Sequence, residues 1–289
     1  MNGIILVDKP EGFTSFDVVA KLRGILHERR IGHSGTLDPM ATGLLVVFVG
    51  RATRAVEFAE SHEKEYIAAL RPGIVTDTQD ITGTVLETSE KTCSKYELLA
   101  VLPEFTGELM QTPPMYSAIK IGGKKLYEFA RKGVEVERES RKVTIKKLEL
   151  VGEENGDCIL RIVCSKGTYI RTLVSDIGER LGTGATLSKL RRTAAGEYSI
   201  RDAHTLDEIS ELAQKGGLDT IFMPVDSIFE EYPCFTVTEA QLKRCLNGNS
   251  FEASLADGKY RAYDENGSFL MLGNVENGIM STVKSFFEI

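Results

Sequence analysis

The sequence predicts an α+β fold: a mixed, largely antiparallel sheet flanked by helices, followed by a small C-terminal β-barrel. Two apolar runs, Val143–Val151 and Cys158–Cys164, lie on either side of the polar turn Glu153–Asp157 and predict an antiparallel pair of strands. Thr168–Leu181 has apolar residues at helical spacing, which predicts a helix that packs on the sheet. From Phe235 onward, short strands alternate with tight turns, which indicates a separate β-rich unit.

The composition is that of an ordinary globular protein. The chain has 289 residues, of which 42% are hydrophobic and 27% charged, and this excludes wholesale disorder, collagen-like repeats and a coiled-coil rod. The longest apolar run, Leu44–Val49, is far shorter than the ~20 residues of a membrane-spanning helix. The first residues show no secretory signal, so we expect a cytoplasmic protein with no membrane partner.

The five cysteines are odd in number, and no two of them have CxxC spacing. This pattern argues against a disulfide framework and against a zinc site. We therefore expect reduced, buried thiols and no metal.

The N-terminal segment predicts a strand, a helix, a loop and a second strand. Gly3–Val7 has the composition of a short buried strand, and Thr14–Asp17 has the form of a capping box that starts a helix running to about Arg29. Ile31–Gly43 is rich in glycine and predicts a structured loop. Leu44–Val49, which is bounded by Gly50, predicts a central strand.

The middle of the chain predicts further helices and strands around one extended loop. The loop is Gln111–Tyr116, because Pro113 and Pro114 exclude helix there. Further helices are expected over Ala52–Ser61, Ser94–Leu102 and Leu126–Lys132, and further strands over Tyr66–Leu70 and Thr84–Leu86.

The C-terminal region contains Asp257-Gly258 and Asn266-Gly267, two dipeptides typical of tight hairpin turns. We expect the linker near Glu230–Pro233. The predicted domains are therefore a larger N-terminal domain over residues 1–232 and a β-rich domain over residues 233–289.

The segment Gly32–Gly43, GHSGTLDPMATG, carries the strongest chemical signal. Its glycines let the backbone bend sharply and let a ligand approach closely. Asp38 precedes Pro39, which favours an extended backbone and projects the carboxylate away from any helix. A carboxylate on a rigid loop is a candidate nucleophile. The alternative is structural, with Asp38 as an N-cap and Pro39 at the first position of a short helix.

Several other segments occur in a recognisable order around this loop. They are Lys9–Ser15 (KPEGFTS), Lys64–Tyr66 (KEY), Thr76–Asp80 (TDTQD), Gln111–Lys120 (QTPPMYSAIK), Gly167–Leu173 (GTYIRTL) and Leu190–Arg192 (LRR). Together with GHSGTLDP they resemble the bacterial tRNA pseudouridine synthases of the TruB type, over roughly residues 3 to 200.

The resemblance implies roles for the catalytic residues. Asp38 matches the family's nucleophile, and Arg171 matches the arginine that pairs with it. Tyr66 matches the tyrosine that stacks on the target uracil, and Tyr169 matches a residue that lines the base pocket. The implied reaction converts uridine 55 in the T loop of tRNA to pseudouridine, without a cofactor, in a pseudouridine synthase fold.

The resemblance also implies further contacts to the substrate. His33 and Leu190 match positions that contact the flipped nucleotide, and Lys9 and Asp80 match further active-site positions. The tail from Phe235 resembles the small RNA-binding module called PUA. The implied partner is the T arm of tRNA; no protein partner is implied, and we expect a monomer.

The residue chemistry fits this interpretation independently. Isomerisation breaks the bond from N1 to C1′ and joins C5 to C1′, so it consumes neither electrons nor water. A single carboxylate can attack or stabilise an electron-poor sugar carbon, and water must be excluded from the site. An arginine beside the carboxylate would keep it ionised by lowering its pKa. Extruding the base from a folded RNA loop costs a few kcal/mol, and stacking on an aromatic ring returns ~1–3 kcal/mol.

Three alternatives remain open at this point. One is a guide-dependent pseudouridine synthase that acts on other RNA. A second is a tRNA-binding folding chaperone with secondary catalysis, although the presence of Asp38 argues against lost activity. A third is a glycosidase-like hydrolase, which lacks a second carboxylate at a recognisable spacing.

The net charge of -7 argues against a nucleic-acid partner until it is resolved along the chain. Lys120–Lys147 holds ten Lys or Arg against four Glu, a local charge of +6. Lys21–Arg30 and Thr186–Arg201 each carry +3, whereas Asp202–Glu239 carries -8. The three basic runs predict a phosphate-binding surface. We expect them to share one face with Asp38 and the acidic segment to lie mostly off it.

Overall fold

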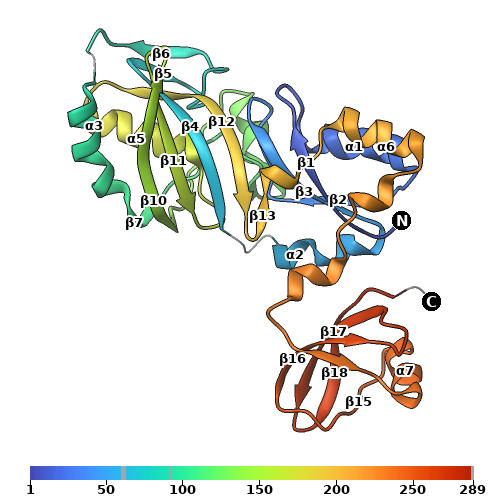
Figure 1. Cartoon of the computed structure of the whole chain (residues 1–289). Helices are drawn as coiled ribbons and strands as arrows, with labels where there is room; N and C mark the ends of the chain where they lie inside the picture. The colour runs from blue at the N-terminus through green and yellow to red at the C-terminus, as the bar shows by residue number, and fades with distance from the viewer. Residues whose placement is uncertain (60–62, 92, 288–289) are drawn as a thin grey trace.

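The computed structural model describes residues 1–59, 63–91 and 93–287 (Figure 1). These residues form a nine-stranded sheet, a five-stranded C-terminal sheet and two short hairpins, β5–β6 (Ile74–Thr76, Val85–Thr88) and β8–β9 (Lys120–Ile121, Lys124–Lys125). The nine-stranded sheet consists of β1 (Gly3–Lys9), β2 (Ile31–Ser34), β3 (Thr42–Val49), β4 (Lys64–Pro72), β7 (Gly107–Gln111), β10 (Arg141–Glu154), β11 (Asp157–Cys164), β12 (Ala185–Ala195) and β13 (Tyr198–Ser199).

The main path of the large sheet runs β1-β3-β12-β4-β11-β10-β7, with β2 beside β3 and β13 beside β12. Among the described strands of this sheet, the β3–β12 pair is parallel and the other pairs are antiparallel. The predicted fold class, a mixed and largely antiparallel sheet flanked by helices, is therefore confirmed. None of the helices among the described residues is long and apolar enough to span a membrane.

Both faces of β1 and β3 are buried, which explains their continuous apolar sequences. Ile5 and Val47 face the helices α1 (Ser15–Leu26) and α6 (Leu206–Lys215). Ile4 and Phe48 face the opposite side. Helices α5 (Ile170–Leu181) and α3 (Lys95–Val101) cover the other half of the sheet, over β4, β11 and β12 (Figure 1).

The N-terminal expectations hold with two corrections. The capping box of Thr14 and Asp17 is present, but α1 ends at Leu26 because His27 takes a left-handed conformation. The expected loop over Ile31–Gly43 begins instead as strand β2, which pairs with β3. Its first residue, Ile31, is buried in the core, and this burial favours pairing despite the glycines.

The middle helices are shorter than expected. The segment from Gly50 forms a 3₁₀ turn and then α2 (Val56–Ala59), and the predicted end at Ser61 lies outside the described residues. Helix α3 ends at Val101, before Pro103, and is followed by a 3₁₀ turn over Leu102–Phe105 that contains Pro103. Helix α4 covers Leu126–Ala130.

The C-terminal sheet has the order β14-β16-β17-β18-β15 and curls into a half-barrel (Figure 1). Its elements are β14 (Cys234–Thr236), α7 (Glu239–Leu246), β15 (Phe251–Glu252), β16 (Gly258–Tyr263), β17 (Phe269–Glu276) and β18 (Ile279–Ser285). Phe269 and Phe286 pack on Phe229, and Lys284 pairs with Glu57 of α2, which ties this sheet to the first part of the chain. The domain boundary between residues 232 and 233 stays a prediction.

Gly43 is the glycine that the sheet most requires. Its φ of +99° is left-handed, and a Cβ there would collide with the backbone of Arg192 across the parallel β3–β12 pair. We expect Gly43→Ala to lose about 1–2 kcal/mol for the backbone conformation and about 1–3 kcal/mol more for the overlap, measured by urea unfolding.

Gly12 provides the matched control for this prediction. It also has a left-handed φ, +81°, but a Cβ added there would meet nothing within 4 Å, so Gly12→Ala tests the backbone strain alone. Equal losses for the two variants would contradict the role of close strand approach at Gly43.

Candidate active site

Asp38 lies in a tight turn that follows β2. The Asp38 carbonyl accepts a hydrogen bond from the Ala41 N–H (3.0 Å), which closes a four-residue turn with Pro39 at its second position. No helix starts at this point among the described residues, so the alternative role of Asp38 as a helix N-cap is excluded. The neighbours Leu37 and Met40 are buried in the core, and the Asp38 side chain stays 39% exposed.

The N-terminal segment holds this turn on both sides of Asp38. The Ser15 hydroxyl accepts from the Leu37 N–H (2.9 Å) and donates to the Leu37 carbonyl (3.2 Å). The Gly12 N–H donates to the Pro39 carbonyl (2.9 Å). Since the residues before and after Asp38 are both fixed, the carboxylate has a defined position.

Lys9 lies beneath the turn and is fully buried. Its Nζ donates to the carbonyls of Phe13 (2.5 Å) and Pro39 (3.4 Å). Burial lowers the pKa of Lys9 to about 8, and the nearby Asp38 charge opposes this shift. Lys9 therefore supports the turn and is not among the residues that line the pocket.

Arg171 is the partner of Asp38 and is nearly inaccessible, with 5% of its side chain exposed. Its Nε lies 2.9 Å from Asp38 Oδ2. Its Nη1 donates to the Thr78 carbonyl (3.0 Å) and its Nη2 to the Tyr116 carbonyl (2.8 Å). Asp80 Oδ2 lies 3.5 Å from Nη1. One guanidinium thus joins three loops at the first turn of α5.

Asp80 is buried behind this guanidinium and does not line the pocket. Its Oδ1 accepts hydrogen bonds from the Thr78 hydroxyl (2.9 Å), the Thr82 N–H (3.0 Å) and the Thr82 hydroxyl (2.6 Å). These contacts make Asp80 a fixed counter-charge for Arg171.

The net pKa shift of Asp38 differs from the expectation. Burial raises the pKa of Asp38, and the Arg171 charge opposes that rise without reversing it. The nearby Asp80 charge adds to the rise. Arg171 thus lowers the pKa of Asp38 as expected, but the net pKa is raised because the walls of the pocket withdraw water from the carboxylate.

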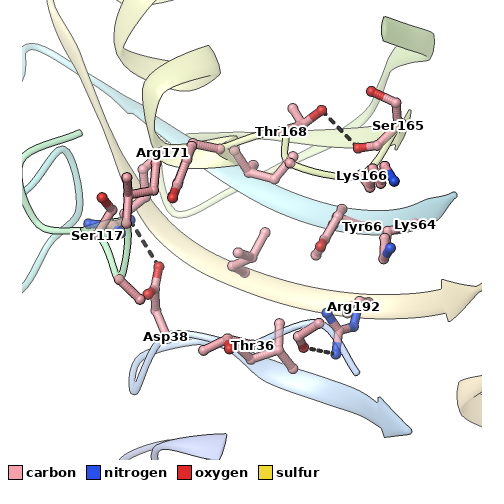
Figure 2. A pocket seen from close by; sticks show the side chains of 18 of the residues that line it. Thr36, Asp38, Lys64, Tyr66, Ser117, Ser165, Lys166, Thr168, Arg171 and Arg192 are labelled. Atoms are coloured by element: carbon pink, nitrogen blue, oxygen red, sulfur yellow. Dashed lines mark hydrogen bonds and ion pairs between the residues drawn. The ribbon is translucent and has the colours of Figure 1, made fainter. Parts of the chain in front are cut away.

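A cavity of about 840 Å³ opens above the Asp38–Arg171 pair (Figure 2). Of the predicted site residues, six line it: His33, Asp38, Tyr66, Tyr169, Arg171 and Leu190. Thus β2, β4, β12 and α5 each contribute a predicted residue to one pocket.

Tyr66 and His33 are both neutral groups in this pocket. Burial raises the pKa of the Tyr66 hydroxyl, although the Arg192 charge opposes the shift. Burial lowers the pKa of His33, and Arg192 lowers it further. The Nδ1 atom of His33 is buried and has no hydrogen-bond partner among the described residues.

Tyr169 is fixed at the N-terminal end of α5. Its N–H donates to Gln111 Oε1 (2.7 Å), and its carbonyl accepts from Gln111 Nε2 (3.0 Å). The Arg141 guanidinium lies 4.9 Å from the centre of the Tyr169 ring. The Arg141 cation therefore covers one face of the Tyr169 ring, and Tyr169 lines the pocket.

Sequence reasoning missed Arg192 as a site residue. Arg192 is buried, donates from Nε to the Leu44 carbonyl (2.7 Å) and from Nη2 to the Gly35 carbonyl (2.8 Å), and lines the pocket. Strand periodicity could have found it, because residues two apart share a face and Leu190 was already predicted. Arg191 points away and pairs with Asp8 (2.7 Å).

Further missed residues give the pocket its positive charge and its polar wall. They are Lys64, Ser117, Arg141, Lys142 and Lys166. No group of three or more His, Cys, Asp or Glu side chains suited to a metal occurs within the described ranges.

Two of the three basic runs reach the pocket, through Arg141 and Arg192. The third run, Lys21–Arg30, does not reach the pocket. Helix α1, which carries Lys21, packs beside α6 of the acidic segment (Figure 1), and Lys21 and Gln214 line the same groove. Because none of the residues from Lys21 to Arg30 lines the Asp38 pocket, a basic face shared with this run stays a prediction.

Comparison with known proteins gives a consistent result. Residues 23–170 match the TruB family pseudouridylate synthase N-terminal domain, and residues 171–230 match the tRNA pseudouridylate synthase B C-terminal domain. The tRNA pseudouridine synthase B of Clostridium kluyveri is 40% identical over 99% of this chain and 100% of its own. That of Pseudomonas fluorescens is 45% identical over 95% of this chain and 92% of its own.

Solved structures share the fold at lower identity. A Cbf5-Nop10-Gar1 complex matches with a TM-score of 0.74 and 25% identity, over 99% of this chain and 85% of the matched chain. An H/ACA RNP bound to a substrate RNA containing 2′-deoxyuridine matches with a TM-score of 0.73 and 23% identity, over 99% and 85%.

Because Arg171 joins three loops, its substitution should strongly lower the free energy of unfolding. A lysine keeps the charge but has one nitrogen, so Arg171→Lys leaves buried acceptors among Asp38, Asp80 and two carbonyls without donors. We expect a loss of about 2–4 kcal/mol in urea unfolding.

Arg180 is the matched control, because it lies on the same helix and forms a similar fork with Glu104 (2.7 and 2.8 Å) but is more than half exposed. Arg180→Lys should change stability by less than about 1 kcal/mol. A similar loss for both variants would contradict the proposed role of Arg171 as the joint of three loops.

Proposed function

The chain belongs to the TruB family of tRNA pseudouridine synthases, and from this premise we propose that it converts uridine 55 in the T loop of tRNA to pseudouridine, with Asp38 as nucleophile. As a member of this family, the protein is an isomerase that acts on tRNA. The assignment of Asp38 as nucleophile rests on the Asp38–Arg171 pair, in which Arg171 Nε and Asp38 Oδ2 lie 2.9 Å apart in the pocket.

The chemistry requires a carboxylate that reaches the substrate while its partner stays fixed. Asp38 is 39% exposed toward the pocket, whereas Arg171 is 5% exposed and is bonded to two other loops. Arg171 stabilises the ionised form of Asp38 and the negative charge that returns to it when the sugar leaves.

Tyr66 and Leu190 support the placement of the target base. They come from the neighbouring strands β4 and β12 and line the same cavity. Stacking on the Tyr66 ring would contribute ~1–3 kcal/mol toward the cost of flipping the base. We assign Tyr169 to the other wall of the base pocket and His33 to the contact with the flipped nucleotide.

The positive side chains around the pocket suit the phosphates of the T arm. Arg141 and Lys142 line the pocket, and so do Lys64, Lys166 and Arg192, which lie near Tyr66 (Figure 2). We propose positioning roles for Lys9 and Asp80, since each supports the Asp38–Arg171 pair from behind. The C-terminal sheet is proposed as a PUA-like RNA-binding unit of a monomeric enzyme.

The guide-dependent alternative is less well supported. The solved ribonucleoprotein components share at most 25% identity among the matches given above, whereas the tRNA pseudouridine synthases share 40–45%. The chaperone alternative is separated from catalysis by the experiment that follows.

Pseudouridine formation removes hydrogen from uracil C5, so tRNA that carries tritium there should release it to water. We expect release by the wild-type protein and none by Asp38→Asn. The amide oxygen of asparagine still accepts from Arg171 Nε, so this variant should fold and bind tRNA. Gel-shift binding and thermal unfolding provide the controls.

Each outcome has a distinct meaning. Normal release by Asp38→Asn would contradict the nucleophile assignment. Binding of tRNA by the wild type without any release would support the chaperone function instead. Release from a tRNA that lacks uridine only at position 55 would contradict the site assignment.

The raised pKa of Asp38 predicts the pH dependence of the reaction. Ionised Asp38 is the reactive form, so kcat/KM should fall as pH decreases, with an apparent pKa above the ordinary value of 3.8. Single-turnover tritium release between pH 4.5 and 8 measures this limb. A rate that increases toward pH 4.5 would show that the protonated carboxyl is required.

A further inference from the structure

We propose that Ser117 is a further substrate-binding residue, whose hydroxyl forms a hydrogen bond with the ribose 2′-hydroxyl of the flipped nucleotide. This inference rests on the proposed function, because it concerns the nucleotide that Asp38 attacks. It adds a contact that would distinguish RNA from DNA at the target position.

Ser117 is a buried polar residue with an unused hydroxyl. It is 5% exposed, and its Oγ has no hydrogen-bond partner among the described residues. Its side chain lines the catalytic cavity (Figure 2). Most buried polar atoms are hydrogen-bonded, because an unsatisfied hydroxyl is unfavourable. A hydrogen-bond partner on a substrate that enters the cavity would account for a serine at this position.

The backbone around Ser117 is fixed relative to the catalytic pair. The Tyr116 carbonyl accepts from Arg171 Nη2 (2.8 Å), and the same guanidinium holds Asp38 through Nε (2.9 Å). The Ser117 carbonyl accepts from the Tyr127 N–H (3.2 Å). The hydroxyl is therefore held close to Asp38 before any substrate binds.

The arrangement of the pocket indicates which part of the nucleotide lies near Ser117. Tyr66, which we propose as the stacking partner of the base, is adjacent to Arg192, and Arg192 binds the Gly35 carbonyl. Ser117 is instead adjacent to the Asp38–Arg171 end (Figure 2). In the proposed complex, C1′, the atom that joins the base to the sugar, lies at Asp38. Because the base lies on the Tyr66 side of Asp38, the ribose lies on the Ser117 side.

The 2′-hydroxyl is the polar group on the carbon next to C1′. It both donates and accepts hydrogen bonds, as does the serine hydroxyl, so either direction of the bond is possible. A serine at this position would thus read the sugar and leave the base to Tyr66 and Leu190.

The first test compares stability with turnover. Because Ser117 Oγ makes no hydrogen bond within the described protein, Ser117→Ala should leave the melting temperature unchanged or slightly higher. Tritium release from tRNA should nevertheless fall by about threefold to tenfold in kcat/KM, the effect of one neutral hydrogen bond.

Ser188 supplies the matched control, because it is a buried serine whose Oγ donates to Asp157 (2.5 Å) and which does not line the pocket. Ser188→Ala should lower the melting temperature and leave kcat/KM near the wild-type value well below that temperature. A drop in melting temperature for Ser117→Ala similar to that for Ser188→Ala would overturn the assignment of Ser117 as a substrate contact.

The second test asks which atom Ser117 contacts. In the Asp38→Asn background, where RNA is not converted, Kd is measured for T-arm RNA with uridine or 2′-deoxyuridine at the target position. Ser117→Ala should weaken binding of the uridine RNA by about threefold to tenfold and leave binding of the deoxyuridine RNA unchanged.

The outcomes separate the inference from the proposed function. Absence of tritium release by the wild type would contradict the function. Release by the wild type with equal release by Ser117→Ala would contradict the inference alone. Equal weakening with both RNAs would overturn the assignment to the 2′-hydroxyl.

Discussion

The buried guanidinium of Arg171 is the interaction on which the rest of the site depends. It binds Asp38, the Thr78 carbonyl and the Tyr116 carbonyl from one planar group. These residues come from three loops that are distant in sequence, so no local preference could align them. Because the guanidinium is nearly inaccessible, each bond is made in a low-dielectric setting, where leaving an acceptor unpaired is costly. The loops therefore hold one another in place through a single side chain.

The opposite side of the Asp38 turn is fixed by the N-terminal segment. Ser15 binds both backbone groups of Leu37, and Lys9 and Gly12 bind the Pro39 carbonyl. The KPEGFTS and GHSGTLDP motifs are thus one structural unit, although Ser15 and Leu37, which are in contact, lie 22 positions apart in the sequence. With Arg171 on one side and this segment on the other, the carboxylate is preorganised for the proposed attack.

Sequence reasoning succeeded where the determinants are local and failed where they are tertiary. The capping box of Thr14 needs only its neighbours, so helix α1 was predictable. Strand β2 was missed because the glycines after Ile31 favour a loop. Only the pairing with β3, which the sequence does not show, identifies the segment as a strand. Arg171 was assigned through the resemblance, since the residue types within its own segment do not reveal its three partners. Burial of Lys9 and the missing partner of Ser117 are properties of the packed protein and have no sequence signal.

The two aspartates that share Arg171 differ in ways that fit the proposed reactivity of Asp38. Asp80 is inaccessible, and its Oδ1 accepts three hydrogen bonds from Thr78 and Thr82. These bonds stabilise its negative charge in addition to the contact with Arg171. Asp38 makes its ion pair through one guanidinium nitrogen, and part of its surface faces the cavity. In the proposed reaction, fewer donors leave its lone pairs available to an electron-poor carbon. Burial raises its pKa, and the nearby Asp80 charge adds to that rise. The Arg171 charge opposes this rise and favours the ionised form of Asp38, while part of the carboxylate surface stays open to the cavity. The fixed Asp80 supplies the permanent partner for Arg171, which allows Asp38 to exchange that contact for the substrate.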